Sequence, residues 1–121
     1  MQATQSNRLE TVDILGFMHT YLTMTSGSQV GSIFRLDPKI ENSIGRGLEC
    51  TVVLTDPLCS RVHATVKYED GSWQLCDAGS RNGCYVNGQK VADATLADTN
   101  RLRVGSTEFS FHQAPDAPPG K

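Results

Sequence analysis

Three short segments of this sequence carry side chains that could together hold a tetrahedral oxyanion. These side chains are Arg46, Ser60, Arg61, His63 and Asn82, within the segments Gly45-Arg46, Ser60–His63 and Ser80–Gly83. Arginine offers a planar fork of hydrogen-bond donors, while serine and asparagine add directional hydrogen bonds without adding repulsive negative charge. The pattern predicts a site that receives a phosphate group, with no obvious machinery for transferring one.

Length, composition and net charge limit what else the protein can be. The chain has 121 residues, of which 38% are hydrophobic and 20% are charged, as is usual for one domain that can bury its own core. Its net charge of -2 argues against a broad nucleic-acid surface, which would need a basic stripe. Anion recognition should therefore be local, and we expect no direct contact with nucleic acid.

The sequence gives no signal for a membrane, a metal or a disulfide. No apolar run approaches the length of a membrane span, and Met1–Arg8 lacks the apolar centre of a secretory signal, so we expect a cytoplasmic protein with no membrane partner. The cysteines have no Cys-x-x-Cys spacing and are predicted to be reduced structural thiols with no metal or cofactor. They are Cys50, Cys59, Cys76 and Cys84.

The residues from Phe17 to His112 show the alternation that is typical of β-strands. Polar and apolar residues alternate in short runs, so that Ala64, Val66 and Tyr68 share one face of a strand. No stretch of about ten residues has convincing helical spacing. The alternating runs are Thr20–Met24, Ser32–Leu36, His63–Tyr68, Ser72–Cys76 and Thr107–Phe111.

Turn signals separate these runs at short intervals. Glu69-Asp70-Gly71 and Asn87-Gly88 are typical of hairpins, Gly105-Ser106 should lead into the last strand, and Gly27 and Gly31 bracket the first turn. Closely spaced turns favour an antiparallel sandwich over alternating strands and helices. We therefore expect two packed sheets.

The composition divides the chain into three parts. Residues 1–16 do not continue the strand pattern and are predicted to be an N-terminal arm or linker. Residues 17–112 form the predicted domain. Residues 113–121 are rich in proline, which predicts a flexible C-terminal tail that connects the domain to further parts of a longer protein.

The order and spacing of the motifs resemble those of the forkhead-associated (FHA) domain, a phosphothreonine-binding module. The resemblance covers about residues 20–112 and depends on the ordered set, because Gly-Arg and Asn-Gly pairs are individually common. It implies an all-β sandwich of two antiparallel-rich sheets and about eleven strands, with the binding loops at one end. The matching residues are Gly45-Arg46, Leu54–Pro57, Ser60–Ala64, Asp77, Ser80, Asn82-Gly83 and Asn87-Gly88.

The resemblance implies unequal roles for the phosphothreonine-binding residues. Arg46 is the expected principal ligand, because a fixed cation makes charge-assisted contacts to phosphate. Ser60 should donate its hydroxyl, and Arg61 and Arg81 are expected auxiliary donors. Asn82 should fasten the peptide backbone. The plainer alternatives are a surface ion pair for Arg46, a turn hydrogen bond for Ser60 and an ordinary Asn-Gly turn at Asn82.

A second set of residues is expected to shape the loops rather than to touch the phosphate. One glycine should let the backbone present the arginine, another should give the asparagine room, and the histidine should brace the loops. These loop-structural residues are Gly45, His63, Gly83, Asn87 and Gly88.

Two features of the sequence leave room for other readings. His63 beside Ser60 raises the alternative of Ser-His-Asp hydrolysis with Asp77, although a nucleophile also needs an aligned base and an oxyanion hole. Cys84 stands where the family frequently has threonine or serine, a departure that should affect loop packing more than phosphate chemistry.

The sequence therefore predicts a non-catalytic module of intracellular signalling that binds a phosphothreonine-containing protein or peptide. The full-length protein could join it to further signalling or regulatory domains. The alternative is a phosphate-independent scaffold of the same fold, which would self-associate through a sheet face or the N-terminal arm.

Overall fold

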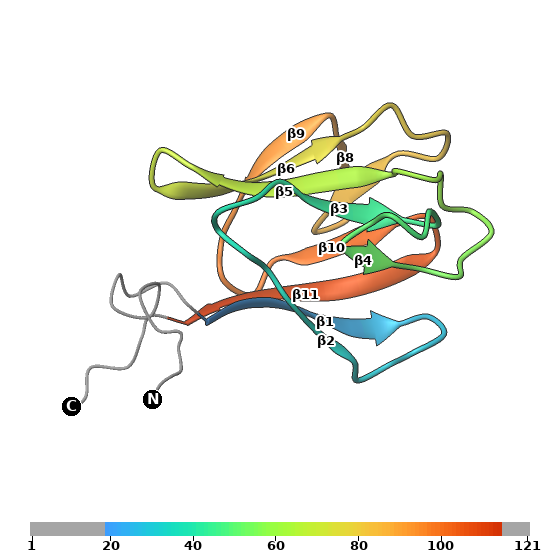
Figure 1. The fold of residues 1–121 in the computed structure, drawn as a ribbon, viewed down its shortest axis with the longest axis horizontal. Helices are drawn as coiled ribbons and strands as arrows, with labels where there is room; N and C mark the ends of the chain where they lie inside the picture. Colours follow the sequence, from blue (N-terminus) through green and yellow to red (C-terminus); the bar gives the residue numbers. More distant parts are fainter. Residues whose placement is uncertain (1–18, 115–121) are drawn as a thin grey trace.

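Eleven β-strands make up the secondary structure of residues 19–114, the part of the chain that the computed structural model describes (Figure 1). No helix occurs among these residues. The strands are β1 (His19–Ser26), β2 (Ile33–Arg35), β3 (Asn42–Gly45), β4 (Val52–Val53), β5 (Ala64–Glu69), β6 (Ser72–Asp77), β7 (Cys84–Val86), β8 (Gln89–Val91), β9 (Asp93–Leu96), β10 (Arg101–Val104) and β11 (Thr107–Ala114).

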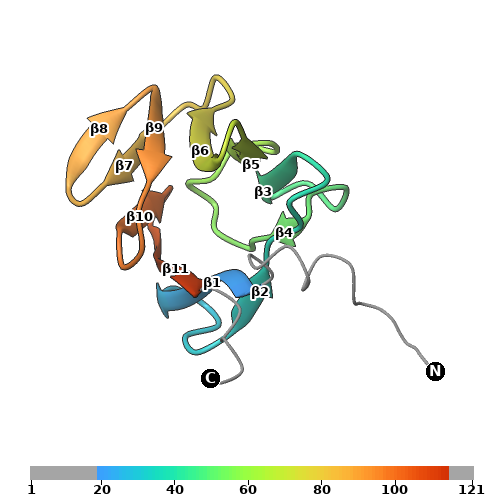
Figure 2. The ribbon, with the colours of Figure 1, turned by 90° about the vertical axis from the view of Figure 1, so that its left-hand side faces the viewer.

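The strands form two sheets that pack against each other (Figure 2). The first sheet has six strands in the order β2-β1-β11-β10-β7-β8, and the second has five in the order β4-β3-β5-β6-β9. Within residues 19–114, the short pairing of β3 with β4 is parallel and the other strand pairs are antiparallel. The predicted all-β, antiparallel-rich sandwich is thus confirmed.

The space between the sheets holds the hydrophobic core. Trp73 and Leu75 from β6 meet Phe109 and Phe111 from β11, and all four side chains are fully buried. They occupy alternate positions because successive side chains of a strand point to opposite faces. Phe34 packs edge-on against Phe109, with ring centroids 6.0 Å apart. The inward faces predicted from the alternation are confirmed.

Two hairpin turns follow the predicted chemistry. Asp70 and Gly71, between β5 and β6, have φ angles of 54° and 83°, and Asn87 and Gly88, between β7 and β8, have φ angles of 51° and 86°. Two successive positive φ angles are the mark of a type I′ turn, whose twist matches that of paired strands. Asn87 also accepts a hydrogen bond from the Arg101 N–H at 2.8 Å through its side-chain oxygen, which ties the turn to β10.

Most of the predicted arm and tail lies outside the described residues. β1 begins at His19 and runs antiparallel to β11, which ends at Ala114. The division into residues 1–16, 17–112 and 113–121 therefore stays a prediction. Residues 19–114 contain no helix long and apolar enough to cross a membrane.

Phe109→Ala should lower the free energy of unfolding by about 3–5 kcal/mol, because it leaves a cavity between the two sheets. Trp73, the single tryptophan, is fully buried and will report unfolding by its fluorescence in a denaturant titration. The control is Ile33→Ala, whose side chain is 65% exposed and should change stability by less than about 0.5 kcal/mol. Equal losses in the two variants would contradict this account of the core.

Candidate anion-binding site

The three segments singled out in the sequence meet at one end of the sandwich, the right-hand end in Figure 1. The backbone after β3 bonds to the loop before β5: the Arg46 N–H donates to the Ser60 carbonyl at 3.0 Å, and the Gly47 N–H donates to the Arg61 carbonyl at 2.8 Å. The Arg81 N–H, from the loop after β6, donates to the Ser60 hydroxyl oxygen at 3.1 Å. Residues that are distant in sequence are thereby held side by side.

This close approach requires glycine at position 45. A Cβ atom placed on Gly45 would collide with the carbonyl group of Arg61 and would lie 2.8 Å from the carbonyl oxygen of Ser60. Any side chain would push the two loops apart and displace Arg46. The predicted structural role of Gly45 thus has a steric basis.

A shallow hollow of about 430 Å³ lies between these loops. It is open to solvent, and three of its lining residues are arginines, which makes it locally cationic on a chain of net charge -2. The predicted phosphate ligands are therefore brought together. The hollow is lined by Arg46, Pro57, Leu58, Cys59, Ser60, Arg61, Arg81 and Asn82.

The three arginines differ in how far they are already engaged. Arg46 is anchored by its Nε, which donates to the Cys59 carbonyl at 2.6 Å, while its two terminal nitrogens have no partner among residues 19–114. Arg61 forms an ion pair with Glu49 at 3.2 Å, but both side chains are more than half exposed. The guanidinium of Arg81 has no hydrogen-bond or ion-pair partner within residues 19–114. Arg46 is consequently the best oriented of the three.

Ser60 and Asn82 each have a side-chain donor or acceptor that is unpaired within residues 19–114. The Ser60 hydroxyl oxygen accepts from the Arg81 N–H, while its own proton has no acceptor in the described part of the chain. Asn82 donates through Nδ2 to the Leu58 carbonyl at 2.8 Å, so it bridges the two loops. Its side-chain oxygen has no donor within residues 19–114. The hollow therefore offers a hydroxyl donor and an amide acceptor beside the guanidinium groups.

His63 is a brace and does not form a catalytic triad with Ser60 and Asp77. Its ring is fully buried; Nδ1 accepts from the Ser60 N–H at 3.1 Å, so Nε2 carries the proton and donates to the Gly83 carbonyl at 2.7 Å. Both nitrogens thus contact backbone groups and neither contacts the Ser60 hydroxyl. The Asp77 carboxylate bonds to Ser80 instead.

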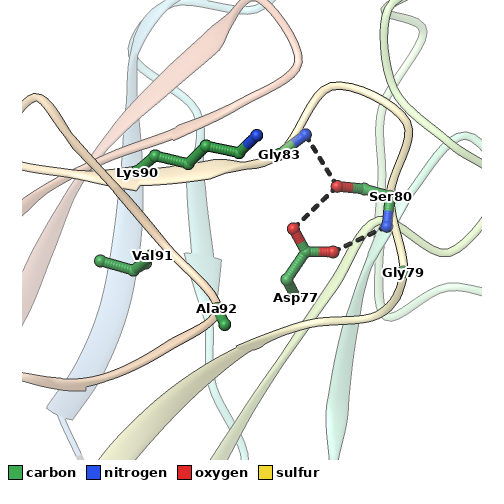
Figure 3. Close-up of a pocket in the computed structure, with 7 residues that line it drawn as sticks. All are labelled: Asp77, Gly79, Ser80, Gly83, Lys90, Val91 and Ala92. Atoms are coloured by element: carbon green, nitrogen blue, oxygen red, sulfur yellow. Dashed lines mark hydrogen bonds between the residues drawn. The ribbon is translucent and has the colours of Figure 1, made fainter.

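Asp77 organises the loop that carries Asn82 (Figure 3). One carboxylate oxygen accepts from the Ser80 N–H at 2.7 Å, and the other accepts from the Ser80 hydroxyl at 3.0 Å. The Ser80 hydroxyl oxygen accepts in turn from the Gly83 N–H at 2.9 Å. Gly83 itself has a φ of 83°, a conformation that favours glycine. The motif match included Asp77 and Ser80, but only their contacts reveal this chain of bonds.

Cys84, which stands where the family frequently has threonine or serine, is a packing residue in this fold. Its side chain is fully buried at the start of β7 and belongs to the hydrophobic core. Burial, together with the negative charge and hydrogen bond of Asp77, raises the pKa of the Cys84 thiol to about 12. The residue is therefore a neutral, buried packing group at the end of the loop.

The other cysteines are also free thiols, and Cys59 lines the hollow beside Arg46. All four cysteines are free, and burial followed by the charge of Asp56 raises the pKa of Cys59 to about 12. Among residues 19–114 no group of histidine, cysteine, aspartate and glutamate side chains is placed to hold a metal ion.

Asp56 is a supporting residue that the sequence analysis did not single out. Its carboxylate accepts hydrogen bonds from the Leu58 N–H at 2.9 Å, from the N–H and hydroxyl of Ser106 at 2.7 and 2.9 Å, and from the Thr107 hydroxyl at 2.8 Å. It thereby fixes the loop between β4 and β5 to the turn between β10 and β11. An Asp-Pro pair such as Asp56-Pro57 is common in turns, but local sequence does not reveal that Asp56 bonds to Ser106 and Thr107.

Those bonds also determine the ionisation of Asp56. Burial of the carboxylate opposes its charged form, but the four hydrogen bonds together outweigh that cost and lower the pKa of Asp56 from 3.8 to about 2. The group is therefore ionised throughout the neutral range.

This combination of fold and loops is found in a known protein family. The model of the FHA domain matches residues 42–105, which include all three loop segments. The chain belongs to the FHA-domain family. The match runs from β3 to the turn after β10 and therefore contains every residue predicted for the site.

Among curated proteins, the FHA chain is similar to two bacterial regulators. It is 36% identical over 94 residues to the glycogen accumulation regulator GarA of Mycolicibacterium smegmatis, covering 78% of this chain and 59% of that protein. It is 32% identical over 96 residues to the oxoglutarate dehydrogenase inhibitor of Corynebacterium diphtheriae, covering 79% of this chain and 66% of that protein. The chain thus spans less than two thirds of the length of either relative.

Solved FHA domains have the same architecture. One, from a structural and functional analysis of phosphothreonine-dependent FHA domain interactions, has a TM-score of 0.73 and 31% identity, covering 79% of this chain and 97% of that one. Another, the FHA domain of FhaA complexed with the intracellular domain of Rv3910, has a TM-score of 0.70 and 31% identity, covering 77% of this chain and 99% of that chain. The predicted family and fold are confirmed.

Asp56→Asn should lower the free energy of unfolding at neutral pH by about 2 kcal/mol, because an amide cannot accept all four hydrogen bonds as a carboxylate does. Because the folded-state pKa of Asp56 is depressed, its stabilisation is complete above the unfolded-state pKa of about 3.9 and is lost as the pH falls towards about 2. Denaturant titrations from neutral pH to pH of about 2 should therefore show the two proteins converging in stability.

A constant stability difference between Asp56→Asn and the parent protein across that acidic range would contradict the assigned role of the carboxylate. Asp98→Asn is a matched control, because Asp98 is exposed and accepts a single backbone hydrogen bond, from Gln113, at 2.9 Å. It should change stability by less than about 1 kcal/mol.

Proposed function

We propose that this FHA domain is a non-catalytic module that binds a phosphothreonine-bearing segment of a partner protein through the loops at one end of the sandwich. The observation that carries this proposal is the convergence of Arg46, Ser60 and Asn82 on one hollow, each with unused hydrogen-bonding capacity. The phosphothreonine-dependent interactions of a similar FHA domain support it.

The phosphate would bind between Arg46 and Ser60. The terminal nitrogens of Arg46 supply charge-assisted donors, and the Ser60 hydroxyl, which lines the same hollow, supplies a neutral donor. Arg81 reaches the hollow without breaking a bond, whereas the side chain of Arg61 must first give up an exposed ion pair with Glu49, which costs at most about 1 kcal/mol. Arg46 and Ser60 are therefore principal ligands, and Arg61 and Arg81 are auxiliary.

Asn82 would hold the backbone of the bound segment. Its Nδ2 group is fixed to the Leu58 carbonyl, which orients the side-chain oxygen to accept an N–H from the peptide. Leu58 lines the same hollow and is 52% exposed, so it offers an apolar contact to the methyl group that distinguishes threonine from serine. Burying one methyl group contributes about 0.8 kcal/mol, a modest preference for threonine.

A small contact of this kind is sufficient for signalling. A micromolar complex requires about 8 kcal/mol of net binding free energy. Several charge-assisted hydrogen bonds, each contributing about 1.5–3 kcal/mol before ordering costs, can supply it without a large interface. Assembly would then depend on the kinase and phosphatase that act on the partner.

The setting of the module is part of the proposal. A cytoplasmic location suits four free thiols, since disulfides are rare in that compartment. The relatives are longer than the match and have regulatory names, a glycogen accumulation regulator and an oxoglutarate dehydrogenase inhibitor. We therefore propose a regulatory role in which binding, rather than turnover, produces the effect.

Arg46→Ala should weaken binding of phosphothreonine peptides at least about a hundredfold, because it removes the principal cation while leaving the buried core untouched. The measurement is isothermal titration with peptides selected from a degenerate phosphothreonine library. Lys39→Ala removes an equal charge from an exposed loop before β3 and should leave affinity unchanged. Equal affinity of the parent protein for phosphorylated and unphosphorylated peptides would refute the proposal and favour a phosphate-independent scaffold.

Binding should also weaken as the pH falls through the second pKa of the phosphate, near about 6, because protonation removes negative charge and one acceptor. The test is a series of titrations from neutral pH to about pH 5. A peptide carrying glutamate in place of phosphothreonine should show no such dependence near about pH 6.

A further inference from the structure

The two sheets of this FHA domain carry opposite charge. The strands of the six-stranded sheet contain four cations and one acid, namely Arg35, Lys90, Arg101, Arg103 and Glu108. The strands of the five-stranded sheet contain one cation and three acids, namely Lys67, Glu69, Asp77 and Asp93. A chain of net charge -2 therefore has a cationic side, and that side is distinct from the arginine-lined hollow.

The cations of the six-stranded sheet point away from the core. Leu102 and Val104 of β10 are buried between the sheets, so Arg101 and Arg103, at the alternate positions, lie on the outer face. Strand register then aligns Arg103 with Tyr85 of β7. We call Tyr85, Lys90, Arg101 and Arg103 the basic face.

The basic face continues to β8 and meets little negative charge. Tyr85 is paired in register with Lys90, and Arg103 is paired on its other side with Glu108. Glu108 forms no ion pair with Arg103, and within residues 19–114 neither Lys90 nor Arg101 forms one either. Glu108 therefore balances the three cations of this face only in part.

Arg103 is held in position by an aromatic ring. Its guanidinium carbon lies 4.0 Å from the centroid of the Tyr85 ring, and its Nη1 donates to the Gly105 carbonyl at 3.4 Å. Stacking of this kind orders the planar donor fork, so less side-chain entropy is lost when a carboxylate binds. The ordered guanidinium is suited to acidic side chains.

A small hollow of about 240 Å³ lies on the same face, lined by Tyr85, Gly88, Arg101, Leu102, Arg103 and Glu108. It is smaller than the usual pockets for small molecules, which have volumes of about 300–1,000 Å³. Its size suits a single side chain of a larger partner. Two of its lining residues are arginines and one, Glu108, is acidic, so its charge is net positive, which favours a carboxylate.

The basic face begins beside the proposed phosphothreonine site. Lys90 crosses over Gly83: a Cβ atom built on Gly83 would lie 2.8 Å from Cε of Lys90. Figure 3 shows the Lys90 side chain pointing towards Gly83, in the same loop as Ser80. A peptide that leaves the loops on the side of Gly83 would meet Lys90 first and then Tyr85 and Arg103.

We propose that the basic face is a second docking surface, which binds an Asp- and Glu-rich segment of the same partner that presents the phosphothreonine. The inference rests on the proposed function for its link to phosphothreonine, but the charge and geometry of the face are independent of it. Charge complementarity selects an acidic protein segment. Nucleic acid fits less well, because three cations would neutralise few phosphates and the opposite sheet is acidic.

The test compares short phosphothreonine peptides, selected from the library, with versions extended at either end by a glutamate-rich or a glutamine-rich segment. One of the glutamate extensions should bind about tenfold more tightly than its glutamine counterpart at low salt, and less so at high salt. Arg101→Ser/Arg103→Ser should reduce that advantage to about twofold or less while leaving affinity for the short peptide unchanged. Lys90→Ser is a second variant that spares the Tyr85 stack.

The charge-matched control is Lys39→Ser/Lys67→Ser, which should retain the advantage of the acidic extension. Equal binding of glutamate and glutamine extensions, or equal loss in the control, would overturn the proposal. An unphosphorylated glutamate-rich peptide, titrated into isotope-labelled protein, separates this result from failure of the phosphothreonine site. Its chemical-shift changes should map to Tyr85, Lys90, Arg101 and Arg103; changes confined to the loops around Arg46, or stronger changes with a DNA duplex, would contradict the assigned partner.

Discussion

The buried ring of His63 is the contact on which the arrangement of the loops depends. One ring nitrogen accepts from the Ser60 N–H and the other donates to the Gly83 carbonyl, so a single side chain fixes the loop before β5 to the loop before β7. These loops carry Ser60 and Asn82. Because the ring is fully buried, loss of either bond would leave an unpaired polar group, which is costly. The position of the proposed ligands is therefore set from inside the fold.

Two carboxylates extend this internal support to the remaining loops. Asp77 closes the turn through Ser80 and Gly83, and Asp56 joins the β4–β5 loop to Ser106 and Thr107. Both carboxylates accept hydrogen bonds from neutral N–H and hydroxyl groups. Within residues 19–114, neither Asp56 nor Asp77 forms an ion pair with Arg46 or Arg81, which remain available for an anion. Histidine and aspartate, which in another setting would suggest catalysis, here serve to hold a binding surface rigid.

The distribution of charge separates two kinds of recognition within one small domain. The hollow at the loop end contains donors suited to a single phosphate, whereas the basic face presents cations on two strands of the six-stranded sheet, β8 and β10. Lys90, next to Gly83, connects the two regions. A partner that combines a phosphorylated threonine with acidic residues would engage both, and the second contact would add affinity mainly by raising the local concentration of the first.

The fold was predictable from the sequence because alternation and turn residues are local signals, whereas the order of the motifs named candidate site residues whose roles stay a prediction. Alternation placed Trp73 and Phe109 in the core, and the Asn87-Gly88 pair predicted its hairpin through the backbone conformation that such residues favour. The tertiary structure alone decided that Asp56 anchors a turn some 50 residues away, that Arg61 is paired with Glu49, and that one sheet is basic and the other acidic. These features depend on strand order and on contacts between distant segments, about which local spacing carries no information.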